Sequence, residues 1–155
     1  MAEIGALTGR FGLSRQVARR LVRNPGDAWL AIRVLGWAVV LPMLKHRVPA
    51  AKLARFMWIP PKRGRDAERE ETIVALSRLV TRARPGSTRN CYERSLISYR
   101  YLAREGADPR LVTGLTPDHS GHAWVTVDGK PVWELGNLTE FVEVATFGRD
   151  GELAR

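Results

Sequence analysis

Two stretches decide the fold: N-C-Y-E-R-S-L-I-S-Y-R-Y-L-A-R-E-G at residues 90–106 and G-H-A-W-V-T-V-D-G-K-P-V-W-E at residues 121–134. The first predicts a helix that begins after Asn90, a good N-cap residue, and stops at Gly106. The second alternates as a strand, turns at D-G-K and returns, which predicts a β-hairpin. Between them R-L-V-T-G-L predicts a further strand. A cysteine and a histidine therefore stand at the starts of two regular elements.

The cysteine is Cys91, the only one in the chain, in the first turn of the predicted helix. Glu93 follows Asn90 by three residues and could complete a capping box with it. Unpaired N–H groups and the positive end of the helix dipole favour a thiolate at this position. The backbone N–H of Cys91 could also serve in an oxyanion hole. The alternative is a buried, inert thiol, because free cysteines are among the most buried residues.

The histidine is His122, at the start of the predicted strand, where it could act as the general base for Cys91. A third group would orient the imidazole ring, as in known triads. Asp128 is close in sequence, but it lies six residues further along the same strand. At roughly 3.3 Å per residue it would be about 20 Å from His122, so we expect it to cap the turn.

The length of the hairpin turn decides which acid faces His122. A three-residue turn pairs Val127 with Pro131 and places Glu134 diagonal to His122 on the same face of the hairpin. A two-residue turn would place Glu134 on the other face. We expect the three-residue turn, with Asp128 as the competing acid. The predicted catalytic triad is Cys91, His122 and Glu134.

In this triad Cys91 would attack, His122 would take and return the proton, and Glu134 would stabilise the imidazolium. The other histidines have simpler interpretations: His119 lies in a loop that could line the substrate entrance, and His46 is expected at the surface. No closely spaced set of His, Cys and carboxylate residues occurs, so we expect neither a metal nor a cofactor.

The composition indicates one domain with an ordinary core. The chain has 155 residues, 45% of them hydrophobic, and its single cysteine excludes an internal disulfide framework and a cysteine zinc cluster. Residues 1–10 lack the pattern of a secretory signal, so we expect a cytoplasmic protein.

The net charge of +9 is concentrated in the front of the chain. Residues 1–90 carry 18 Lys and Arg against 6 Asp and Glu, whereas residues 91–155 carry 7 against 10. A basic surface attracts acidic partners of any kind. The basic run at Lys62 to Arg65 lacks interleaved aromatic residues, so we interpret it as a solvated loop and expect no nucleic acid.

The front of the chain also contains its most apolar run, Val34 to Leu44, 11 residues without a charge. A membrane span needs about 18 or more, so we expect no membrane crossing. A buried core helix, a surface that docks a partner or peptide, and contact with a membrane interface all remain open. The loop at residues 59–65 suggests a division into an N-terminal helical segment, 1–64, and a core, 65–155.

The runs N-C-Y-E-R-S-L, R-L-V-T-G-L and G-H-A-W-V-T-V-D-G-K-P-V-W-E resemble the transglutaminase-like core of the lasso-peptide leader peptidases, the microcin-processing family. The resemblance covers roughly Arg84 to Gly136. It implies an α+β, papain/transglutaminase-like cysteine protease core, a helix packed on an antiparallel sheet, preceded by N-terminal helices. It maps Cys91 and His122 directly and places the acid at Glu134. The family's acid is often Asp, and Tyr92 stands where the family usually has an aliphatic residue.

The same resemblance implies a function: removal of the leader from a ribosomally made lasso-peptide precursor. The implied partners are the precursor peptide, a small leader-recognition protein and an ATP-dependent lasso cyclase. The chain leaves no obvious room for the recognition domain, so it resembles the stand-alone peptidase. Two alternatives stay open: an acyltransferase or amidase on the same fold, and a non-catalytic basic binding protein.

Overall fold

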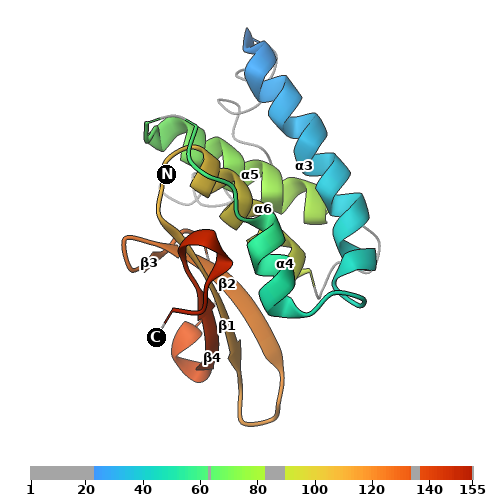
Figure 1. The fold of residues 1–155 in the computed structure, drawn as a ribbon, viewed down its shortest axis with the longest axis vertical. Helices are drawn as coiled ribbons and strands as arrows, with labels where there is room; N and C mark the ends of the chain where they lie inside the picture. Colours follow the sequence, from blue (N-terminus) through green and yellow to red (C-terminus); the bar gives the residue numbers. More distant parts are fainter. Residues whose placement is uncertain (1–22, 63, 83–89, 134–136, 155) are drawn as a thin grey trace, which may run out of the picture.

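The computed structural model describes residues 23–62, 64–82, 90–133 and 137–154. In chain order the elements are α3 (Pro25–Leu44), α4 (Ala50–Met57), α5 (Ala67–Arg82), α6 (Cys91–Arg104), β1 (Pro109–Leu115), β2 (Gly121–Val127), β3 (Lys130–Pro131), the 3-10 helix η3 (Leu138–Glu140), β4 (Val142–Phe147) and the 3-10 helix η4 (Arg149–Gly151). The strands form one antiparallel sheet in the order β3-β2-β1-β4. The helices gather on one side of it (Figure 1), which confirms the predicted α+β class.

Helix α3 begins with a side-chain cap at Asn24. The Asn24 side chain accepts a hydrogen bond from the Gly26 N–H at 3.0 Å, and Pro25 occupies the first helical position. An asparagine side chain before a helix accepts a hydrogen bond from an N–H that has no partner within the helix. Proline suits the first helical position because it has no N–H to leave unpaired. One face is buried at a spacing of three or four residues, by Leu30, Val34, Ala38 and Leu41.

The opposite face of α3 is apolar and exposed. Its large side chains are between 43% and 65% exposed: Trp29, Ile32, Leu35, Val39, Val40 and Met43. The buried-core interpretation of Val34 to Leu44 is therefore confirmed for one face and wrong for the other. By length and composition α3 is the one helix among the described residues that could cross a membrane, a test that core helices of soluble proteins also pass.

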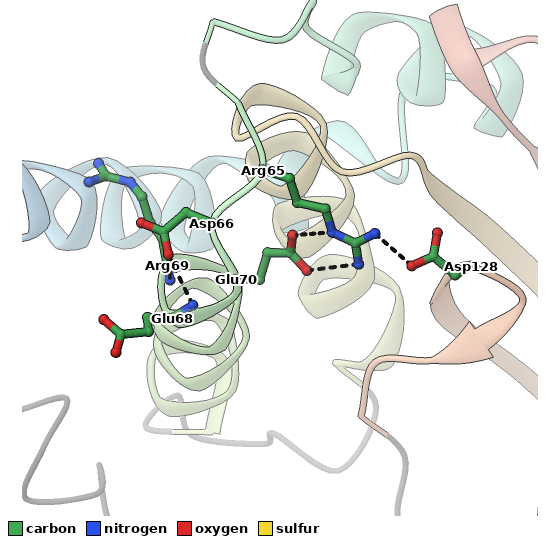
Figure 2. A network of polar contacts seen from close by, with 6 residues as sticks. All are labelled: Arg65, Asp66, Glu68, Arg69, Glu70 and Asp128. Carbon is green, nitrogen blue, oxygen red and sulfur yellow. Dashed lines mark hydrogen bonds and ion pairs between the residues drawn. The ribbon is translucent and has the colours of Figure 1, made fainter.

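Helix α5 begins at a side-chain cap, and α6 matches its prediction closely. The Asp66 carboxylate accepts hydrogen bonds from the N–H groups of Glu68 and Arg69, which starts α5 (Figure 2). Helix α6 stops one residue before the predicted end. Gly106 has a positive φ of 85°, and the N–H of Ala107 bonds to the carbonyl of Leu102, as in a Schellman ending.

One continuous hydrophobic core joins all four described helices to the sheet. Its fully buried members include Leu41, Leu53, Ile73, Leu96 and Leu111, one from each of α3 to α6 and from β1. The helices of the front segment thus contribute side chains to the same core as the rest of the chain. The division at residue 64 stays a prediction.

The β2–β3 hairpin corrects the predicted turn. Val127 pairs with Lys130 and Thr126 with Pro131, so the turn has two residues rather than three. Asp128 and Gly129 have φ angles of 53° and 74°. Two positive φ angles define a type I′ turn, which an Asp-Gly pair adopts readily and whose twist matches that of the flanking strands. The register that placed Glu134 diagonal to His122 was therefore wrong.

Candidate functional site

Cys91 is the first residue of α6 and is half-buried. The Asn90 carbonyl accepts the hydrogen bond from the Arg94 N–H at 3.0 Å, which is the first bond of the helix. The N–H groups of the first turn, including that of Cys91, have no partner within the helix. The predicted place of Cys91 at a helix N-terminus is confirmed.

The predicted capping box is wrong. The Asn90 side chain makes no cap bond and instead donates from Nδ2 to the Thr81 carbonyl, 2.8 Å away in the last turn of α5. Glu93 is fully buried and accepts a hydrogen bond from Lys45 Nζ at 2.7 Å. Both side chains thus bind groups distant in sequence, a carbonyl at a helix end and a half-buried ammonium group. Asn90 consequently does not cover the N–H groups around Cys91.

His122 is the second residue of β2 and packs among aromatic rings. Its ring centroid lies 6.0 Å from that of Trp124 and 5.0 Å from that of Phe141, just before β4. Gly114 pairs with His122 across β1 and β2. A Cβ at Gly114 would lie 3.0 Å from both the Trp124 ring and the Val142 carbonyl oxygen, so a larger residue would force the ring or the backbone to shift.

Phe141 and Gly114 are site residues that sequence reasoning missed. A usable signal existed for Gly114, because glycine inside a strand pattern such as V-T-G-L often marks a close approach. Phe141 comes from the far edge of the sheet, and nothing in its local sequence connects it to His122.

A hydrogen bond joins the helix of Cys91 to the strand of His122. Ser95, one turn after Cys91 in α6, donates from Oγ to the Ala123 carbonyl at 2.9 Å. Strand β3 pairs only with Thr126 and Val127, at the other end of β2. The start of α6 and the start of β2 therefore lie side by side.

His122 lies on the face of β2 that is turned away from α6. Val125 lines a small cavity with Ser95 and Ser98 of α6, so its face of β2 is turned toward the helix. Side chains alternate along a strand, which turns His122 and Trp124 to the other face. A pairing of His122 with the Cys91 sulfur would form around the edge of β2 rather than through the sheet.

Tyr92, beside Cys91, carries a perturbed phenol. Burial, and to a lesser extent the charge of Glu93, raises the pKa of Tyr92 above its ordinary value. Its buried hydroxyl has no hydrogen-bond partner in the described part of the chain. The phenol therefore stays neutral well into the alkaline range.

Glu134 lies outside the described residues. The two-residue turn removes the register argument for Glu134, so its assignment as the acid rests on the family resemblance alone and stays a prediction. The residue before Glu134, Trp133, has two arginines close to its ring. The guanidinium of Arg78 lies 3.7 Å from the centroid of the Trp133 ring and that of Arg94 lies 4.7 Å from it. Because Arg94 stands in the first turn of α6, Trp133 is fixed beside the helix end that carries Cys91.

The competing acid, Asp128, has another role. Its carboxylate accepts a hydrogen bond from Arg65 Nη1 at 2.6 Å, and the same guanidinium donates to both oxygens of Glu70 (Figure 2). Asp128 thus ties the turn to the start of α5, as expected for a residue of the turn. With β2 fully extended it stands about 20 Å from His122.

The remaining histidines are exposed. His119 has a positive φ of 65° in the β1–β2 loop. Hydrogen bonds from the Thr116 and Ser120 hydroxyls lower the pKa of the adjacent Asp118. His46 follows α3 at the surface, as predicted. Among the residues that the structure describes, no three His, Cys or carboxylate side chains gather as metal ligands would.

Comparison with known proteins identifies the family. The family model described as the transglutaminase-like superfamily matches residues 30–146, well over half of the chain. The match begins inside α3 and includes Cys91 and His122. Curated proteins and solved structures gave no match. Proteins with this fold commonly have cysteine-protease or acyltransferase activity. The chain belongs to the transglutaminase-like superfamily.

Proposed function

We propose that this protein is a cysteine peptidase that removes the leader peptide from a lasso-peptide precursor in the cytoplasm. A separate leader-recognition protein would deliver the precursor and a cyclase would close the ring on the freed amine. The observation that carries the proposal is the contact between the helix that Cys91 begins and the strand that His122 begins, made by Ser95 and Ala123. The resemblance of these two segments to the leader peptidases supplies the substrate.

The chemistry follows from these positions. The Cys91 sulfur attacks the carbonyl carbon of the scissile bond, and its proton passes to His122. The N–H groups at the start of α6 stabilise the oxyanion. His122 then protonates the leaving amine as the C–N bond breaks and a thioester forms. Water activated by His122 hydrolyses the thioester and restores the thiol. Glu134, in this proposal, orients the imidazole ring.

An acyltransferase is the second candidate, because the superfamily match fits both activities. Its first half-reaction is the same, and an amine replaces water in the second. The two reactions therefore share Cys91 and His122 and differ in the acceptor.

Incubation of the purified protein with a lasso precursor and its recognition protein, followed by mass spectrometry, tests the proposal. Cys91→Ala and His122→Ala should abolish cleavage, while His46→Ala, an exposed histidine that follows α3, should leave it unchanged. A product joined to an added amine would support the acyltransferase. Full cleavage by Cys91→Ala would overturn both enzymatic proposals.

A further inference from the structure

A second concave site lies on the other side of α6 from Cys91. It is a groove of about 510 Å³ between α3, residues 59–62 and the C-terminal half of α6. Arg100 is nine residues after Cys91 in the helix. At 3.6 residues per turn and 1.5 Å per residue, that separation is half a turn around the axis and about 14 Å along it. The groove is therefore separate from the Cys91 site.

The groove is lined by positively charged side chains and by two aromatic rings. Its charged residues are Arg33, Lys62, Arg100 and Arg104, and its rings are those of Trp37 and Tyr101. Among the described residues that line it, none is a carboxylate. The carboxylate of Glu105 lies 4.0 Å from Arg104, but it is buried against Arg69 at 3.0 Å. The groove thus presents positive charge without a compensating anion at its surface.

Arg100 is held rigidly in this groove. Its guanidinium donates to the carbonyls of Phe56 and Met57 at 3.1 and 3.2 Å and lies 4.8 Å from the centroid of the Trp37 ring. Burial is the main cause that lowers the pKa of Arg100, and the neighbouring charges of Arg104 and Arg33 add to it. An anion bound between these cations would relieve that repulsion.

An exposed apolar stripe runs beside the groove on α3. Ile32, Leu35, Val39 and Met43 are each between 55% and 65% exposed and recur at helical spacing. Over 11 residues the stripe is about 16 Å long, or three turns of a helix. A small anion would occupy only part of the groove and would leave this stripe uncovered. A helix of similar length could cover both, with apolar side chains on the stripe and carboxylates over the groove.

The chain's own front segment has the wrong charge to be this occupant. Residues 1–22 carry four arginines against one acidic residue, Glu3. Packed into a groove lined by four cations, they would meet repulsion of like charges. The charge of the groove favours an occupant rich in Asp and Glu.

We propose that this groove and the adjoining stripe of α3 bind an acidic amphipathic helix from another polypeptide. Carboxylates pair with Arg33, Arg104 and Lys62, and bulky apolar residues pack on Leu35 and Val39. The site uses neither Cys91 nor His122, so it stands independently of the peptidase proposal.

Fluorescence anisotropy of the full chain with a labelled synthetic peptide tests this. The peptide is a helix of Leu and Glu with Leu on one face. Its controls are a permuted peptide of the same composition and one with Lys for Glu. We expect binding of the first peptide at least tenfold tighter than of either control, and weakened by salt.

Two charge reversals, Arg33→Glu and Lys62→Glu, should each weaken binding about tenfold, as should the apolar change Leu35→Ser. Lys52→Glu, an exposed change of the same charge on α4 outside the groove, should not. Equal affinity for the amphipathic and permuted peptides would overturn the proposal, and so would equal losses in Arg33→Glu and Lys52→Glu. Displacement of the peptide by anionic phosphatidylglycerol vesicles would assign the surface to a membrane instead.

Discussion

Gly114 decides, at the scale of single residues, whether the aromatic rings around His122 can pack. A methyl group there would meet the Trp124 ring and the Val142 carbonyl oxygen at 3.0 Å. We expect Gly114→Ala to lower the free energy of unfolding by about 1–3 kcal/mol, since overpacking forces a shift of backbone or ring. Gly36→Ala, in open space on α3, is the matched control and should stabilise by about 0.5–1 kcal/mol. Denaturant unfolding measures both, and equal effects would contradict the packing argument.

Tyr92 provides a prediction that depends on pH. The folded state raises the pKa of this phenol, so its contribution to stability is complete below pH about 10 and is lost as pH rises through the folded pKa. In Tyr92→Phe the buried hydroxyl without a partner is gone. We expect neutral-pH stability to stay the same or to rise by about 1 kcal/mol, and the loss of stability above pH 10 to become smaller. Thermal unfolding at pH 7 and pH 11 tests this, and a large loss at pH 7 would show that the hydroxyl has a partner.

The identity of the acid that orients His122 can also be tested at the scale of single residues. Glu134→Gln should reduce turnover by orders of magnitude if this carboxylate orients His122, because the imidazolium loses its counter-charge. Asp128→Asn should instead affect mainly the turn and its bond to Arg65. Precursor cleavage rates of both variants decide between them. The opposite ranking would remove Glu134 from the triad.

At the scale of the elements, Ser95 joins α6 to β2. Ser95→Ala removes the buried hydrogen bond from α6 to the Ala123 carbonyl. The cost should be about 1–3 kcal/mol of unfolding free energy, together with a lower cleavage rate because the Cys91 helix is no longer tied to β2. Ser77→Ala also removes a buried hydroxyl, but one that bonds within its own helix to Ile73 at 2.8 Å. A similar loss of cleavage in both variants would contradict a positioning role for Ser95.

The elements show where the sequence predicted well. The helix from Cys91 and its stop at Gly106 follow from local signals, and the structure confirms them. The cap and the turn were predicted wrongly for different reasons. Asn90 and Glu93 bind Thr81 and Lys45, partners that local pattern cannot reveal. The length of the turn was predicted wrongly because D-G-K permits two turn lengths. The positive φ angles of Asp128 and Gly129 correspond to the shorter one.

At the scale of the whole molecule, the prediction for α3 was correct for only one of its two faces. Its apolar run predicts a core helix, yet only one face of the helix, from Leu30 to Leu41, is buried. The Lys45–Glu93 pair ties the end of α3 to the start of α6 at 2.7 Å, so the front of the chain supports the helix that carries Cys91. The family match, which begins at residue 30, includes this support. Composition and periodicity do not show which helix faces meet, because that depends on contacts across the fold.

The pairing of Cys91 with His122 depends on the whole fold and can be tested without a substrate. Cys91 is the only cysteine, so carbamidomethylation by iodoacetamide, followed by intact-mass spectrometry, reports its reactivity alone. If His122 activates the thiol, labelling at neutral pH should slow at least tenfold in His122→Ala and stay unchanged in His119→Ala. Equal labelling rates in the parent protein and both variants would contradict the proposal that Cys91 and His122 act together.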